Sequence, residues 1–174
     1  MKSVKCTIEG ISPLLMHAFP MQPVEALEKK SPEEQAEIST YRVPVTNELH
    51  IPAIAIQRSL VSSATYSKGK GRGSLQKAVA ACVIISPEYC LLGTNEYQVD
   101  ARPVVIPATK GRVVRYRPRL DKWGVTFTIE YDDTLLTEAQ VRRVVDDAGS
   151  RVGLLDFRPE RKGPFGRFMV TSWD

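Results

Sequence analysis

Three arginines at two-residue spacing stand out in the run RVVRYRPRL, residues 112–120 of this 174-residue chain. Side chains two apart on a β-strand project from one face at a separation of about 6.6–7 Å, close to the spacing of successive phosphates in an extended nucleic-acid strand. Guanidinium groups also match phosphate geometry well. Arg115, Arg117 and Arg119 are therefore candidates for binding a phosphate backbone. The alternative interpretation is an edge strand kept cationic to prevent aggregation.

A second basic segment, GLLDFRPERKGPFGRF at residues 153–168, mixes glycines, cations and phenylalanines. Glycine lets backbone N–H groups converge on an anion without a side chain in the way, and an aromatic ring can stack on a base. The candidate nucleic-acid-binding residues here are Arg158, Arg161, Lys162, Gly163, Phe165, Gly166 and Arg167. The alternative is a tight connection in which Phe165 and Phe168 fill the core. In that case Asp156 would pair with Arg158 or Arg161.

A third group of cations lies between residues 58 and 77, a stretch with five basic residues and no acid. Arg58 falls within an expected helix, whereas Lys68, Lys70 and Arg72 alternate with glycines in the loop SKGKGRGS. Such a loop can clamp a polyanion and become ordered only on binding. A plain flexible linker is the alternative interpretation.

The distribution of charge matters more than the net charge of +4. Residues 102–122 carry seven basic residues and one acid, while residues 25–37 carry five acids and two lysines. Segregation of this kind is typical of a surface that binds a polyanion, although ordinary solvated loops also show it.

The sequence favours binding over catalysis and predicts no cofactor and no metal site. His17 and His50 are the only histidines, and neither they nor the carboxylates have metal-ligand spacing. His17 is a weak catalytic candidate, with Tyr41 or Arg42 able to assist acid–base chemistry. A lone histidine is more often a partly buried loop residue.

The elements that must position these residues follow from periodicity. VKCTIE at residues 4–9 alternates as a half-buried strand, and RFMVTSW at 167–173 reads as the last strand. Apolar residues at helical spacing predict helices over 52–66 and from Thr137 to about residue 152, and a capping-box pattern predicts a short helix over 32–41.

The runs 112–120 and 123–131 are predicted to pair as a hairpin, with Pro118 placing the arginine strand at an edge. Tyr116 and Phe127 then face the core, so the exposed face lacks the aromatic rings that read bases. The resulting order is a ferredoxin-like (RRM-like) βαββαβ antiparallel sheet, with helices on one face and insertions at about 18–50 and 67–106. We expect one domain over residues 1–174.

Two segments together resemble the RAMP superfamily, which includes the Cas7-like CRISPR-associated proteins. Ile51, Pro52, Arg58 and Leu60 in part match the family's first-helix motif. The match to its glycine-rich loop rests on Gly153, Gly163, Phe165, Gly166 and Phe168. Ala53 replaces the usual glycine of the first motif, and Pro164 interrupts the loop. The ending FRPE…GxFGRF is also similar to that of a group of small bacteriophage and prophage proteins.

The resemblance implies an RRM-like fold that binds RNA along its backbone and assembles side by side with RAMP-like partners or copies of itself. It also places His17 in a loop where some RNA-cleaving relatives carry a functional histidine. The acidic segment 25–37 would then meet the basic surface of a neighbour.

These observations predict non-catalytic binding of single-stranded RNA or DNA through phosphates. A metal-independent endoribonuclease and a viral morphogenesis or interaction protein without a nucleic-acid role are the alternatives. Cys6, Cys82 and Cys90 are an odd number without paired spacing and read as buried apolar residues. With no apolar leader and no membrane-spanning run, the chain is expected in the reducing cytoplasm of a bacterial host cell, away from membranes.

Overall fold

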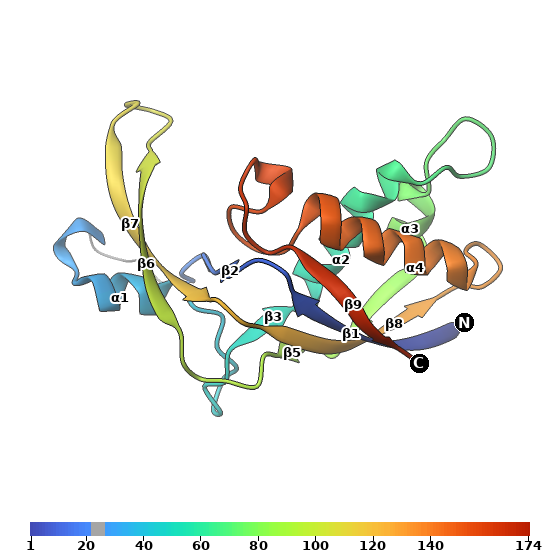
Figure 1. Cartoon of the computed structure of the whole chain (residues 1–174), viewed down its shortest axis with the longest axis horizontal. Coiled ribbons are helices and arrows are strands. Elements are labelled where there is room, and N and C mark those ends of the chain that lie inside the picture. Colours follow the sequence, from blue (N-terminus) through green and yellow to red (C-terminus); the bar gives the residue numbers. More distant parts are fainter. Residues whose placement is uncertain (22–26) are drawn as a thin grey trace.

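A helix-covered sheet and a long two-stranded ribbon make up the computed structural model, which describes residues 1–21 and 27–174 (Figure 1). The central sheet has the strand order β4-β8-β1-β9, and all its neighbours are antiparallel. Its strands are β1 (Lys2–Gly10), β4 (Val83–Ser86), β8 (Gly124–Tyr131) and β9 (Phe168–Trp173). The helices are α1 (Pro32–Ile38), α2 (Ala53–Ser63), α3 (Gln76–Cys82) and α4 (Glu138–Asp147). The protein is therefore a mixed α+β structure with antiparallel sheets.

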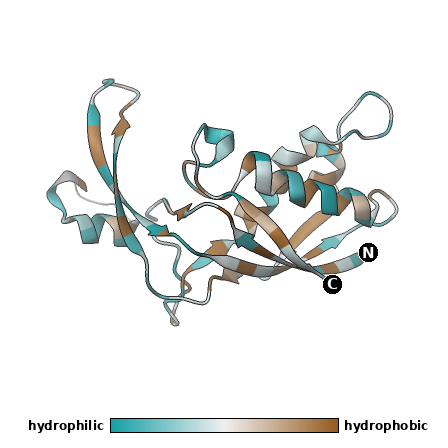
Figure 2. Cartoon of the chain, viewed as in Figure 1, coloured by the Kyte–Doolittle hydropathy of each residue, from teal (hydrophilic) through white to brown (hydrophobic). Residues whose placement is uncertain are grey.

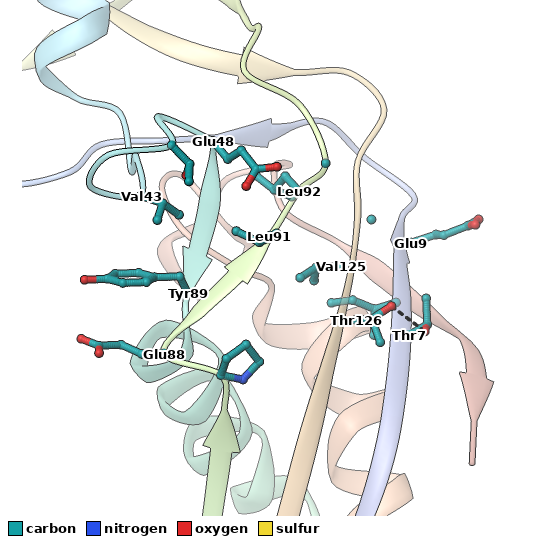
Figure 3. A pocket seen from close by; sticks show the side chains of 15 residues that line it. Thr7, Glu9, Val43, Glu48, Glu88, Tyr89, Leu91, Leu92, Val125 and Thr126 are labelled. Atoms are coloured by element: carbon teal, nitrogen blue, oxygen red, sulfur yellow. Dashed lines mark hydrogen bonds between the residues drawn. The ribbon is translucent and has the colours of Figure 1, made fainter.

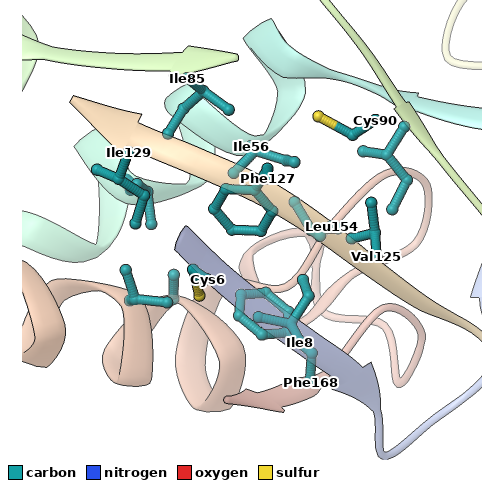
Figure 4. Packing of buried hydrophobic residues seen from close by; sticks show 14 of the residues in the cluster. Cys6, Ile8, Ile56, Ile85, Cys90, Val125, Phe127, Ile129, Leu154 and Phe168 are labelled. Carbon is teal, nitrogen blue, oxygen red and sulfur yellow. The ribbon is translucent and has the colours of Figure 1, made fainter. Parts of the chain in front are cut away.

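The core lies between one face of the central sheet and the helices α2 and α4 (Figure 4). Alternation along β1 and β8 directs Cys6, Ile8, Phe127 and Ile129 into this core, because successive side chains of a strand point to opposite faces. The opposite face of these two strands bears Lys5, Thr7, Glu9, Thr126, Thr128 and Glu130. All three cysteines are free and buried, which confirms their apolar role.

The helix boundaries follow the capping signals in the sequence. The hydroxyl of Thr137 accepts a hydrogen bond from the Gln140 N–H (3.3 Å), and the Gln140 side chain accepts one from the Thr137 N–H (2.9 Å). This capping box starts α4, which continues into the π-helical turn η3 (Ala148–Val152). The hydroxyl of Ser31 caps α1 by accepting from the Glu34 N–H at 3.2 Å.

The predicted hairpin of residues 112–120 with 123–131 is wrong. Strand β7 (Arg112–Leu120) pairs along its length with β6 (Gln98–Val105) and, at its last two residues, with β2 (Leu14–Leu15). Strand β8 pairs with β1 and β4 instead. Trp123 accounts for the separation: its carbonyl accepts from the Gly10 N–H (2.9 Å) and its indole N–H donates to the Ser12 carbonyl (2.8 Å), so the chain turns onto β1.

The predicted insertion boundaries change with this pairing. Residues 67–106 include β4, a strand of the central sheet, as well as β5 (Tyr89–Leu91), which pairs with β3 (His50–Pro52). Within the described part of residues 18–50, the short turn η1 (Leu27–Lys29) and α1 precede β3. Residues 22–26, with Glu25 of the acidic segment, lie outside the described residues.

The β6–β7 ribbon projects away from the central sheet with α1 beside it (Figure 1). Cross-strand pairs show that Val99, Val114 and Val105 share one face, and all three are exposed. The other face carries Asp100, Arg102, Arg115, Arg117 and Arg119. Apolar and hydrophilic residues accordingly follow each other along both strands (Figure 2). Arg115, Arg117 and Arg119 therefore lie on the ribbon and not on the central sheet.

The glycine-rich loop owes its glycines to close backbone packing. A Cβ atom on Gly166 would overlap the backbone carbonyl of Leu154, and Gly166 has a φ of +76°, which side chains disfavour. A Cβ atom on Gly163 would overlap the carbonyl of Phe157. These two glycines let the loop after the short turn η4 (Pro159–Arg161) fold back on itself.

None of the helices in the described ranges combines the length and the apolar character that crossing a lipid bilayer requires.

The substitution Gly166→Ala is expected to lower the free energy of unfolding by about 2–4 kcal/mol, because strain at positive φ adds to a backbone clash. Gly73→Ala is the matched control, since Gly73 has open space around its Cα and no positive φ. The control should change stability by less than about 0.5 kcal/mol. Urea unfolding followed by circular dichroism measures both; equal effects would contradict the packing role.

Candidate nucleic-acid interface

A partly buried ion pair joins the ribbon to the glycine-rich loop. The Nη1 of Arg117 donates to the Oδ2 of Asp156, and the side chain of Arg117 is only 7% exposed. Asp156 is held in place by its own N–H, which donates to the Leu15 carbonyl at 3.0 Å. The same Oδ2 lies 3.6 Å from the Nδ1 of His17. One carboxylate thus contacts residues from the ribbon and from the segment after β1.

The environment of Asp156 keeps it ionised. Burial alone raises the pKa of this carboxyl, but the hydrogen bond from His17 and the charge of Arg117 outweigh burial and hold the pKa below its usual value. Asp156 is therefore a carboxylate at neutral pH. It neutralises Arg117, which would otherwise be a buried, unpaired charge.

The arginine row of β7 is largely occupied by acids of the same chain. Arg119 pairs with Asp121 at 2.7 Å and with Asp100 at 3.3 Å. Asp100 also pairs with Arg102 at 2.8 Å, the cross-strand neighbour of Arg115. Arg117 and Arg119 are thus engaged in the fold, and the expected row of free cations does not form. Asp121 follows the strand directly, but the partners Asp100 and Asp156 are distant in the sequence, and strand periodicity in residues 112–120 cannot reveal them.

Phe165 is not free to stack on a base, because it is 2% exposed. The guanidinium carbons of Arg102 and Arg119 lie 4.6 and 5.6 Å from the centre of its ring, and the ring of Phe157 is 5.9 Å away. The alternative interpretation of a tight connection is correct for Phe165 and Phe168, both buried. Asp156 pairs with Arg117, however, and not with Arg158 or Arg161.

A cavity of about 310 Å³ lies where four distant segments meet, and we call it the His17 basin. Its polar lining consists of His17, Tyr41, Arg58, Ser59, Asp156 and Arg158. Pro52, Ile54 and Ala55 from the start of α2 and Gly153 and Leu155 from the glycine-rich loop complete it. The basin brings together Arg58 of helix α2 and Arg158 of the glycine-rich loop.

Helix α2 presents its first turn to the basin. Pro52 occupies the N-cap and supplies no side-chain hydrogen bond, while the Ala53 N–H donates to the Glu88 carbonyl at 2.9 Å. The N-terminus of a helix carries a partial positive charge of about +0.5. Arg58 follows roughly one turn later and is exposed, with no ion pair to any described residue. The dipole and the guanidinium together favour an anion in the basin.

The other side chains of the basin have defined partners. The hydroxyl of Ser59 donates to the Gly153 carbonyl at 2.8 Å, which ties α2 to the glycine-rich loop. Arg158 donates from Nη1 to the Leu155 carbonyl and from Nη2 to Glu160, both at 2.8 Å. Burial, followed by the charge of Asp156, raises the pKa of Tyr41, so its hydroxyl remains a proton donor at neutral pH.

The remaining predicted site residues do not line the basin. Lys68, Lys70 and Arg72 are exposed on the loop before α3, closed by a bridge between Lys68 and Ser74. Arg161 and Lys162 are exposed at the end of η4. The Nη1 of Arg167 donates to the Ser150 carbonyl at 3.0 Å.

Sequence reasoning missed the role of Asp156 as the link between His17 and Arg117. Only three-dimensional proximity reveals it, since Asp156 is 39 residues from Arg117. Nor does Arg42 assist His17, because its guanidinium is bound to Glu37 at 2.6 Å and to two backbone carbonyls.

Among residues 1–21 and 27–174, no three histidine, cysteine or carboxylate side chains gather in a way that would hold a metal ion.

No protein-family model matches the sequence, and no curated protein is similar to it at a significant level.

Asp156→Asn should lower the free energy of unfolding by about 2–4 kcal/mol, because it leaves the charge of Arg117 buried without a counter-charge. Adding Arg117→Met to this variant should restore part of the loss. The exposed pair of Arg158 and Glu160 provides the control, and Glu160→Gln should cost less than about 1 kcal/mol. Chemical denaturation of the unaltered protein and the three variants is the measurement. If Asp156→Asn left the free energy of unfolding unchanged, the structural role of Asp156 would be contradicted.

Proposed function

We propose that this protein binds single-stranded nucleic acid without cleaving it and holds a backbone phosphate in the His17 basin. The observation that carries the proposal is the convergence of His17, Tyr41, Arg58 and the N-terminus of α2 on one partly enclosed cavity. Exposed Arg161 and Lys162 on the same loop as Arg158 would extend the contact along the strand. Recognition would be of backbone rather than base, since β1 and β8 carry threonines and charged residues on their uncovered face.

We further propose that the fold is of the ferredoxin-like kind and that the chain is a distant RAMP-like protein. The order β4-β8-β1-β9, with α2 between β1 and β4 in the chain and α4 between β8 and β9, supports this arrangement. On this proposal the ribbon and α1 are additions to the four-stranded core. Side-by-side assembly on a strand and a cytoplasmic location in a bacterial host belong to the same proposal.

Arg58→Ala should weaken binding of a labelled single-stranded oligonucleotide by about five- to twentyfold, because a charge-assisted hydrogen bond to phosphate is lost. The dependence of log affinity on log salt should become shallower by about 0.7, the value for one phosphate contact on a single strand. Fluorescence anisotropy across a salt series measures both quantities.

Arg143→Ala is the control, since this exposed arginine lies on α4 outside the basin and pairs with Asp147 at 3.7 Å. Its salt slope should match that of the unaltered protein. If the Arg58 and Arg143 variants bind alike, the basin does not hold a phosphate.

A second candidate function is metal-independent RNA cleavage, favoured by the 3.6 Å approach of His17 Nδ1 to Asp156. With Nδ1 engaged, Nε2 is the nitrogen available to take the proton from a ribose 2′-hydroxyl. The 2′-oxygen would attack phosphorus and expel the 5′-oxygen, which Tyr41 would protonate. The products would be a 2′,3′-cyclic phosphate and a 5′-hydroxyl.

Incubation with labelled RNA in EDTA distinguishes the two functions. Cleavage that disappears in His17→Ala, with DNA of the same sequence left intact, would establish the nuclease. Binding of RNA by the unaltered protein without any cleavage would leave binding as the function. Gel electrophoresis of the RNA is the measurement.

A further inference from the structure

A second cavity, of about 850 Å³, shares no lining residue with the His17 basin. It lies between β5 with the segment 43–48 on one side and the neighbouring ends of β1 and β8 on the other (Figure 3). We call it the β5–β8 groove. Its volume is within the range of cavities that bind small ligands in proteins.

The lining of the groove is apolar with acidic side chains. Val43, Leu91 and Leu92 contribute apolar surface, and Leu91 is 45% exposed. Val125 also lines the groove, but its side chain is buried in the core. Three carboxylates, Glu9, Glu48 and Glu88, also line it. Their side chains form no ion pair or hydrogen bond with any described residue of the chain. A cationic occupant with apolar side chains would therefore complement the groove, and a phosphate backbone would be repelled.

The groove also runs along an open edge of the central sheet. Strand β4 pairs with β8 only from Thr128 to Tyr131, so among the described residues the segment Gly124–Phe127 pairs with β1 on one side and with no strand on the other. Strand β5 lies on that other side without forming a ladder with β8. In the antiparallel ladder of β1 and β8, hydrogen-bonded and non-hydrogen-bonded residue pairs alternate, and the hydrogen bond from the Gly10 N–H to the Trp123 carbonyl shows which pairs are bonded. By that alternation the backbone groups of Gly124 and Thr126 point away from β1, toward the groove.

Strand β5 presents a similar edge. The Leu92 N–H donates to the Leu49 carbonyl (3.0 Å), and the Ala53 N–H donates to the Glu88 carbonyl (2.9 Å). These two hydrogen-bonded pairs flank the Ile51–Cys90 pair of the ladder between β3 and β5. The same alternation directs the backbone groups of Tyr89 and Leu91 away from β3. Unpaired strand edges are templates for an added strand.

We propose that the β5–β8 groove binds an extended segment of a partner protein, in which lysine or arginine alternates with apolar residues. The segment adds as a strand beside Gly124–Thr126, so that backbone hydrogen bonds provide affinity. Its apolar side chains contact Leu91 and Leu92, and its cations pair with Glu9, Glu48 and Glu88. This inference does not depend on the function proposed for the His17 basin.

A fluorescein-labelled peptide KVKVKVK is the probe, with EVEVEVE as its charge-reversed counterpart. The lysine peptide should bind the full-length protein and the glutamate peptide should not. Replacing the three groove carboxylates (Glu9→Gln, Glu48→Gln and Glu88→Gln) should weaken binding by about five- to tenfold, as expected for a few partly exposed ion pairs. The matched control carries Glu33→Gln, Glu34→Gln and Glu96→Gln, which remove three carboxylates outside the groove.

A third peptide, KVKVKVK with every backbone amide N-methylated, separates strand addition from simple contact of side chains. It should lose most of the binding, because neither of its edges can donate a hydrogen bond to β8. Melting curves of both triple variants establish that each is folded, and oligonucleotide binding should be the same in both. Absence of binding by the lysine peptide at millimolar concentration would overturn the proposal. Equal binding of the methylated peptide, or equal affinity of the two triple variants, would overturn it as well.

Discussion

The contact between Arg117 and Asp156 is the constraint on which much of the structure depends. It fastens the base of the ribbon to the glycine-rich loop, and the Asp156 N–H fastens the same loop to β2 through the Leu15 carbonyl. A buried guanidinium is tolerated only with a charged partner. The position of the loop, and with it one wall of the His17 basin, thus follows from an electrostatic requirement of the ribbon.

Arginine clusters in a sequence therefore need not mark a binding surface. Arg117 and Arg119 belong to the stretch with the highest density of positive charge, yet acids of the chain neutralise both. Arg58, which stands alone in an apolar helix, is the cation that faces the basin without an acidic partner among the described residues. Local potential depends on which charges remain unpaired after folding, and that depends on tertiary contacts.

The sequence allowed prediction of the elements better than of their partners. The capping box at Thr137 and the alternation of β1 are local signals, and both elements form where those signals lie. Alternation in residues 112–131 correctly indicated two strands. It could not show that β7 pairs with β6 and β8 with β4, because a period-two pattern indicates which face of a strand is buried but not which strand lies beside it. Of the residues that line the His17 basin, His17, Arg58 and Arg158 were candidates from the sequence, whereas the link through Asp156 depends on residues far apart in the chain.

Sharing of the Asp156 carboxylate has a thermodynamic consequence. His17, in the basin, and Arg117, at the root of the ribbon, draw on the same oxygen atom. On the proposed function, a phosphate that drew the imidazole away would leave that oxygen to the guanidinium alone. Binding in the cavity and displacement of Arg117 would then be coupled equilibria, and by reciprocity each would change the free energy of the other by the same amount.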